Sequence, residues 1–273
     1  MKNTLIMTWY TLREALARKV FISFLIISSI ALLIMILVFS LTDTASIISG
    51  FNKSNQNFPI HQIISGLELL IVTPLSGLCL LLAIFSSASF IPVMLEKGNI
   101  DLLISKPVSR SQLIWGKFWG GILVVFINIA YLVIGAWLII SIKFSYWDFS
   151  FLLIIFSITF TFAVLYSLIM FFGVLTKGQT LGMMVAYFIF IILSPLFVAG
   201  HSEWNVFIQS KFLKSLIDIG YYIIPKTSEL MGKITIELAT GKGIGDYQPI
   251  LTSLAFLILT MGITISIFRK KDF

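Results

Sequence analysis

Residues 96–117 read EKGNIDLLISKPVSRSQLIWGK, a polar stretch between two long apolar runs. It is too polar to cross a bilayer, yet its apolar residues are regularly spaced. Ile100, Leu103 and Ile104 fall on one face of a short helix. This helix must end just before Pro107, because a proline disfavours the helical conformation of the residue that precedes it. The first half of the stretch therefore predicts a short surface helix.

A second helix is predicted to start directly after the proline. Ser109 can accept a hydrogen bond from the first turn while the side chain of Gln112, three residues on, returns one to the backbone. This capping box opens directly into an apolar run. Residues 96–116 are therefore expected to form a charged two-helix elbow at a membrane surface, a shape suited to docking a partner. We call residues 96–116 the elbow.

On both sides of the elbow the chain is dominated by apolar residues. It is 58% hydrophobic and 11% charged, whereas soluble domains carry roughly 25% charge. A β-barrel is excluded because the apolar windows do not alternate with polar residues. The sequence predicts an all-α, polytopic membrane protein with a single transmembrane domain over residues 1–273. Its six predicted spans are residues 20–42, 69–94, 118–142, 149–175, 178–199 and 248–268.

The charge is distributed unevenly between the two sides that this topology defines. The side with both termini, the elbow and Lys177 carries twelve bases and four acids, or +8. The other side carries the remaining seven bases and eight acids, or −1. The positive-inside rule then places both termini and the elbow in the cytoplasm of a cell whose inner (plasma) membrane holds the protein. The net charge of +7 reflects this topology rather than nucleic-acid binding.

Two segments outside the spans are predicted to contact lipid. In residues 1–19, Leu5, Trp9 and Leu12 belong to one apolar stripe, which predicts an interfacial helix on the inner leaflet. Residues 201–246 form the longest outer segment. An apolar arc there ends before Pro225 and predicts an amphipathic helix on the outer leaflet.

A few polar residues within or near the spans are candidates for a substrate pathway. They are Glu68, Ser86 and Ser87. An acid at membrane depth is a functional hypothesis by default. For Glu68 an acid at the outer interface is the favoured alternative, since the window beyond it is long enough without it. For the serines, close helix packing is favoured. The G-x-x-x-G of Gly116–Gly120 is a weak dimer signal, because it lies at the interface.

Signatures of catalysis and metal binding are missing from the sequence. It has no Walker, H-E-x-x-H, C-x-x-C or G-x-S-x-G motif. Two histidines, His61 and His201, and one cysteine, Cys79, make a metal site of protein ligands nearly unbuildable. The spans also lack the charge chains of ion-coupled carriers. If the protein moves a solute uphill, its energy must come from a soluble partner, and the chain itself is not expected to be an enzyme.

Several segments together resemble a known family. The chain is similar over essentially its whole length to permease subunits of ABC exporters of the second type, in particular to the branch that includes permeases linked to multicopper-enzyme maturation and to gliding motility. The segments that carry the resemblance are Arg13-Glu14-Ala15, Glu96-Lys97-Gly98, Leu102-Leu103-Ile104-Ser105-Lys106-Pro107-Val108-Ser109-Arg110, Gly116-Lys117, Tyr221-Tyr222-Ile223-Ile224-Pro225-Lys226 and Phe268-Arg269-Lys270-Lys271-Asp272-Phe273.

The resemblance implies how such a chain would work. Permeases of this type have six spans, pair as homo- or heterodimers, and insert a coupling helix between spans two and three into a separate ATP-binding cassette ATPase. That subunit, and not this chain, would hold ATP and Mg²⁺. The coupling helix would be residues 98–106. The residues expected to contact the ATPase are Glu96, Lys97, Gly98, Asp101, Ile104, Lys106, Pro107 and Arg110.

The resemblance leaves the cargo and one alternative function open. Family substrates range over lipids, glycans, peptides, drugs and sulfur species, and nothing in this sequence selects among them. The alternative is a membrane component that does not transport and instead uses the same ATPase to do mechanical work on a periplasmic or cell-surface partner.

Overall fold

The computed structural model describes residues 2–17, 20–43, 60–96, 98–99, 108–202 and 211–271. Within these ranges the chain forms helices and turns and contains no strand. Six helical segments are long and apolar enough to cross a membrane, which confirms the predicted all-α, six-span class. They comprise α2 (Val20–Leu41), α4 (Ile60–Ser87) with α5 (Phe90–Met94), α7 (Arg110–Phe144), η1 (Ser150–Leu153) with α8 (Ile154–Thr176), α9 (Thr180–Phe188) with η2 (Ile189–Leu193) and α10 (Ser194–Ser202), and α14 (Gln248–Lys270).

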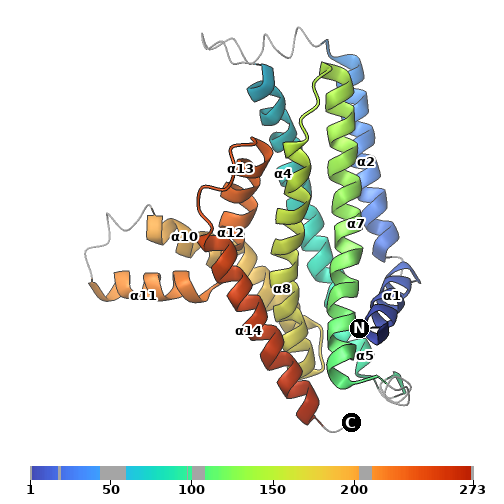
Figure 1. Cartoon of the computed structure of the whole chain (residues 1–273), viewed down its shortest axis with the longest axis vertical. Coiled ribbons are helices and arrows are strands. Elements are labelled where there is room, and N and C mark those ends of the chain that lie inside the picture. The colour runs from blue at the N-terminus through green and yellow to red at the C-terminus, as the bar shows by residue number, and fades with distance from the viewer. Residues whose placement is uncertain are drawn as a thin grey trace.

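The long helices lie side by side and define two ends of the bundle (Figure 1). We call the end where α7 begins and α14 finishes the terminal end, and the end where α7 finishes and α8 begins the opposite end. Both marked chain termini lie near the terminal end (Figure 1). Helix α1 (Lys2–Ala17) packs there against α7.

The centre of the bundle is α8. It packs against α7, α14, α9 and α4, and its buried face includes Phe162, Val164 and Tyr166. By contrast α2, the α9–α10 segment and α14 expose most of their apolar side chains, as expected of helices that face lipid or another membrane protein. The buried surface of α8 makes it the element around which the other spans are arranged.

Helix α7 is much longer than the predicted span of residues 118–142. Its 35 residues correspond to roughly 52 Å at about 1.5 Å per residue. It begins inside the elbow at Arg110 and continues without a break into the membrane span. The second arm of the elbow and the third span are therefore one helix, so a displacement of the elbow is passed directly to the bundle.

The segment after α10 contains more helix than the sequence predicts. Helix α11 (Lys211–Ile223) covers part of the predicted amphipathic segment, projects away from the bundle in Figure 1 and exposes Phe212, Ile219 and Ile223. Its place on the outer leaflet stays a prediction. A second stretch follows in α12 (Thr227–Glu229), η4 (Leu230–Ile234) and α13 (Thr235–Ala239). It packs on α8, where the Ser157 hydroxyl donates to the carbonyl of Leu230 at 2.9 Å.

Candidate functional site

The start of α7 is fixed by the capping box that the sequence predicts. The Gln112 amide N–H donates to Ser109 Oγ at 3.2 Å, and the Ser109 N–H donates to Gln112 Oε1 at 3.0 Å. Ser109 has the extended backbone conformation of an N-cap residue, with φ −70° and ψ 149°. The prediction for this helix start is confirmed, and the second arm of the elbow has a defined first turn.

Arg110, the first residue of α7, connects the elbow to the end of α14. Its guanidinium donates to the carbonyls of Arg269 at 3.1 Å and Lys271 at 2.6 Å. These are carbonyls at a helix C-terminus, where a cation is favourable. The predicted contact of Arg110 with an ATPase stays a prediction; within the chain, its guanidinium bonds the end of α14.

Lys271 extends this connection to α8. Its ammonium donates to the carbonyls of Val174 and Leu175 near the end of α8. Burial, and then the nearby charge of Lys177, lower the pKa of Lys271. Helices α7, α14 and α8 are thus linked at the terminal end by side-chain to carbonyl bonds.

The G-x-x-x-G at Gly116 and Gly120 packs α1 against α7 within the same chain. A Cβ atom on Gly116 would lie 2.4 Å from the Cβ of Met7, and one on Gly120 would lie 2.4 Å from the Cβ of Thr11. Only residues without a side chain permit this approach. The motif therefore positions α1, which explains it without a dimer contact.

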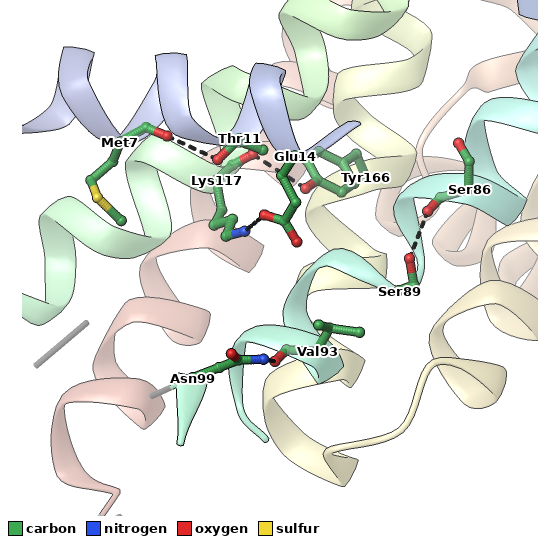
Figure 2. Close-up of polar contacts among 9 residues, drawn as sticks. All are labelled: Met7, Thr11, Glu14, Ser86, Ser89, Val93, Asn99, Lys117 and Tyr166. Carbon is green, nitrogen blue, oxygen red and sulfur yellow. Dashed lines mark hydrogen bonds and ion pairs between the residues drawn. The ribbon is translucent and has the colours of Figure 1, made fainter. Parts of the chain in front are cut away.

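Between the two glycines, Lys117 forms a buried ion pair with Glu14 of α1. Figure 2 shows the two side chains facing each other between the helices, with Tyr166 of α8 beside them. The side chain of Lys117 is 2% exposed and that of Glu14 is 16% exposed. The Tyr166 hydroxyl donates to the Lys117 carbonyl at 3.3 Å, and its ring stacks on Phe118. Sequence spacing gave no signal for this pair.

The first arm of the elbow lies largely outside the described residues. Of the residues in this arm that are predicted to contact an ATPase, Glu96 and Gly98 are described, and both are exposed. Gly98 has φ +93°, a conformation that glycine adopts without strain. Asn99 turns back on α5 by donating to the Val93 carbonyl at 3.0 Å (Figure 2). The predicted contacts that fall outside the described residues are Lys97, Asp101, Ile104, Lys106 and Pro107.

Ser86 and Ser87, predicted as candidates for a substrate pathway, both donate hydrogen bonds to carbonyls of their own helix. The Ser86 hydroxyl donates to the Ala83 carbonyl at 3.0 Å and the Ser87 hydroxyl to the Ile84 carbonyl at 3.3 Å. Ser89 repeats the pattern by donating to the Ser86 carbonyl (Figure 2). Such bonds favour bending of a helix, and α4 ends at Ser87 before α5 begins at Phe90. The serines thus lie at a break between two helices.

Glu68 lies inside the bundle rather than at an exposed interface. Its helix begins at Ile60, whereas the predicted span begins at residue 69, so the acid lies within α4. The side chain is 0% exposed, and neither carboxylate oxygen has a hydrogen-bond partner. It is also not among the residues that line the apolar groove between α2 and α4. Its burial is the feature of this acid that sequence reasoning missed.

A second polar group that sequence reasoning missed lies between α11 and α12, beside the first turns of α14. The Lys226 side chain is buried, with its ammonium 3.6 Å from the centroid of the Tyr221 ring. Burial lowers the pKa of Lys226, against the opposing effects of Glu229 and Asp246. The Tyr221 hydroxyl donates to Glu229 at 3.0 Å, and burial together with the charge of Glu229 raises the pKa of Tyr221. In the sequence, the feature that indicated a change of structure beside Lys226 was Pro225, which follows the end of α11.

His201 belongs to the same region but not to a metal cluster. Its ring stacks on Tyr221 at 4.1 Å, and Nδ1 lies 2.8 Å from a carboxylate oxygen of Asp218. Among the described residues, no group of three or more His, Cys, Asp or Glu side chains is arranged to hold a metal ion.

Comparison with known proteins identifies the family of the chain. The family model described as "ABC-2 family transporter protein" matches residues 12–273, nearly the whole chain. No curated protein matches the chain.

Proposed function

The chain belongs to the ABC-2 family of transporter proteins, and on that basis we propose that it is the permease subunit of an ABC exporter driven by a separate ATPase. Two permease subunits, identical or paralogous, would form the substrate pathway. The ATP-binding cassette ATPase would hold ATP and Mg²⁺ and would dock on the elbow from the cytoplasm.

The observation that carries this proposal is the way the elbow is joined to the bundle. Its second arm is the first part of α7. That part is bonded to α14 through Arg110 and to α1 through the Lys117–Glu14 ion pair. A partner that displaces the elbow would therefore move three helices together. Glu96 and Gly98, before the undescribed residues of the elbow, are exposed and accessible to such a partner.

A charge reversal at the elbow tests the docking of the ATPase. The tagged full-length chain, purified from its native membrane, is expected to bring an ATP-binding cassette subunit with it. Glu96→Lys should weaken this association and lower the ATP hydrolysis of the complex. The matched control is Glu237→Lys, an acid at the opposite end of the bundle whose side chain accepts from Gly245.

Glu96 is the informative position because Arg110, the other charged candidate, also bonds α14. Association and hydrolysis equal to wild type in Glu96→Lys, or the same loss in the control, would count against docking at the elbow. Coupled hydrolysis without movement of any cargo into vesicles would favour mechanical work on a surface partner.

The proposed orientation can be tested with engineered cysteines. The native Cys79 is 2% exposed and should react little with a membrane-impermeant maleimide. In intact cells we expect Tyr146→Cys, in the turn after α7, to be labelled and Glu96→Cys to be protected. Both should be labelled after permeabilisation. Labelling of Glu96→Cys in intact cells would place the elbow outside and would refute docking of a cytoplasmic ATPase there.

A further inference from the structure

Glu68 is the one acidic residue in the six membrane spans. Of the eight buried side-chain nitrogen and oxygen atoms that lack a hydrogen-bond partner in the described part of the chain, two are the carboxylate oxygens of this residue. Native proteins leave few buried polar groups unsatisfied, and each such group calls for an explanation.

Within the described part of the chain, no positively charged side chain bonds to the Glu68 carboxylate. On its own helix the flanking turns present Ile64 and Val72, both buried. The helices packed against α4 are α2, α7, α8, α9 and α13. None of their titratable or charged side chains bonds to Glu68. These side chains are Arg110, Lys117, Tyr131 and Lys143 of α7, Tyr166 of α8, Tyr187 of α9 and Glu237 of α13, while α2 has none.

Most of these side chains are engaged elsewhere. Tyr187 donates to the Leu81 carbonyl and Tyr166 to the Lys117 carbonyl, both well along the bundle toward the terminal end. The charge that acts on Glu68 is that of Asp148, in the turn after α7, and it is also negative. An ionised Glu68 would be a buried charge that the negative charge of Asp148 disfavours.

The ionised and protonated forms of Glu68 differ sharply in free energy when the carboxyl group is buried without a hydrogen-bond partner. An isolated buried carboxylate loses its hydration without compensation, and proteins avoid this by neutralising the group. A protonated carboxyl loses only the hydrogen bonds of a neutral polar group, a smaller penalty. The geometry therefore favours a bound proton in this arrangement of the helices.

The position of Glu68 along α4 indicates where that proton can leave. Glu68 is the ninth residue of α4, roughly 12 Å from the first residue and much nearer to the opposite end than to the break after Ser87. Asp148 lies at that same end and is half-buried. Separation of the helices around the first turns of α4 would expose the carboxyl to water from the opposite end.

We propose that Glu68 is a proton-binding site, which is loaded in this arrangement and exchanges its proton with water when the opposite end of the bundle opens during the transport cycle. The link to a cycle rests on the proposed function. The bound proton does not, because it follows from the burial of the carboxyl alone.

Infrared spectroscopy of the full-length chain in lipid nanodiscs tests the bound proton directly. At neutral pH the wild type should show the C=O stretch of a protonated carboxyl group, and Glu68→Gln should lose it. Glu237→Gln, which removes an acid outside the spans, should retain it. If Glu68→Gln does not fold, Glu68→Asp should shift the band rather than remove it. A wild-type spectrum with carboxylate bands only, or a band that persists unshifted in the Glu68 variants, overturns the proposal.

The rate at which this band shifts in D₂O tests the exchange. In the complex with the ATPase, ATP should make the shift several-fold faster than in the same complex without nucleotide. Equal rates in the two conditions would overturn proton exchange linked to the cycle. If no ATPase is recovered with the chain, the proposed function fails, whereas the band measured on the chain alone still decides the proton site.

Discussion

Removal of the Glu14–Lys117 ion pair should weaken the packing of α1 on α7. The single substitutions Glu14→Met and Lys117→Met should destabilise this packing by different amounts. The pair connects residues 103 positions apart and joins the two helices beside the glycine contacts. Glu14→Met removes the carboxylate from an ammonium whose side chain is 2% exposed. Lys117→Met removes the ammonium from a carboxylate that is 16% exposed and still meets water.

The magnitudes follow from this difference in burial. Breaking a buried pair by removing one partner costs about 3–5 kcal/mol when the remaining charge stays buried. We expect the cost of Glu14→Met to lie near the lower end of that range, because the Lys117 ammonium retains its cation–π contact with the Tyr10 ring, 5.7 Å from the ring centroid. Lys117→Met should cost about 1–3 kcal/mol, since water can solvate Glu14 in part. The double variant should cost less than Glu14→Met alone, because two apolar side chains often replace a buried pair at little cost.

Hydrogen exchange of the backbone amides of α1 is the appropriate assay, because it reports local opening rather than unfolding of the whole bundle. At tenfold per 1.4 kcal/mol, Glu14→Met should accelerate exchange by about two orders of magnitude. The double variant should recover a large part of this protection. Equal effects of the two single substitutions, or a double variant whose effect is their sum, would show that the pair is not a buried ion pair that holds α1.

Three further perturbations have defined outcomes. Gly120→Ala should cost about 1–3 kcal/mol in thermal unfolding, because its Cβ would lie 2.4 Å from the Cβ of Thr11, whereas Gly262→Ala, with no atom within 4 Å, should not destabilise. Arg110→Met should accelerate hydrogen exchange at the end of α14 without affecting α11, and unchanged exchange there would contradict the connection described above. Because burial lowers the pKa of Lys226, the unfolded chain binds more protons than the native one between that lowered pKa and about 10.4, so the stability of the wild type should rise with pH in this window. Lys226→Met should lack this rise, and thermal melts up to about pH 10 compare the two.

The parts of the fold that depend on local sequence could be predicted. The six spans follow from the length of their apolar runs, and the start of α7 follows from Ser109 and Gln112, which need only be three residues apart. The boundaries of the second span were less accurate. Ile60 to Gly66 continue the helix although the stretch is partly polar, because a helix can extend beyond the hydrocarbon.

The parts of the site that depend on a distant partner could not be predicted. Glu14 is one of three charged residues on α1, with Lys2 and Arg13, and nothing in its spacing identifies Lys117 as its partner. Gly116 and Gly120 predict a close helix contact but not which helix supplies it. The helical stretch after Pro225 is bonded to α8 by the contact between Ser157 and Leu230. Because these residues are 73 positions apart, no local sequence pattern predicts the contact. In each case the spacing of residues identifies a helix surface, whereas the tertiary fold determines which element packs against it.

The arrangement of these contacts determines which elements can move when the elbow is displaced. Helix α8 is packed on several sides and has few exposed residues, so moving it would disrupt much of the core. The start of α7 packs against α1, is bonded to α14 through Arg110, and continues into a helix of roughly 52 Å. A tilt of α7 about its contact with α8 would move its two ends in opposite directions. Displacement of the elbow at the terminal end would thus reach the opposite end, where α4 carries Glu68, without any rearrangement of α8.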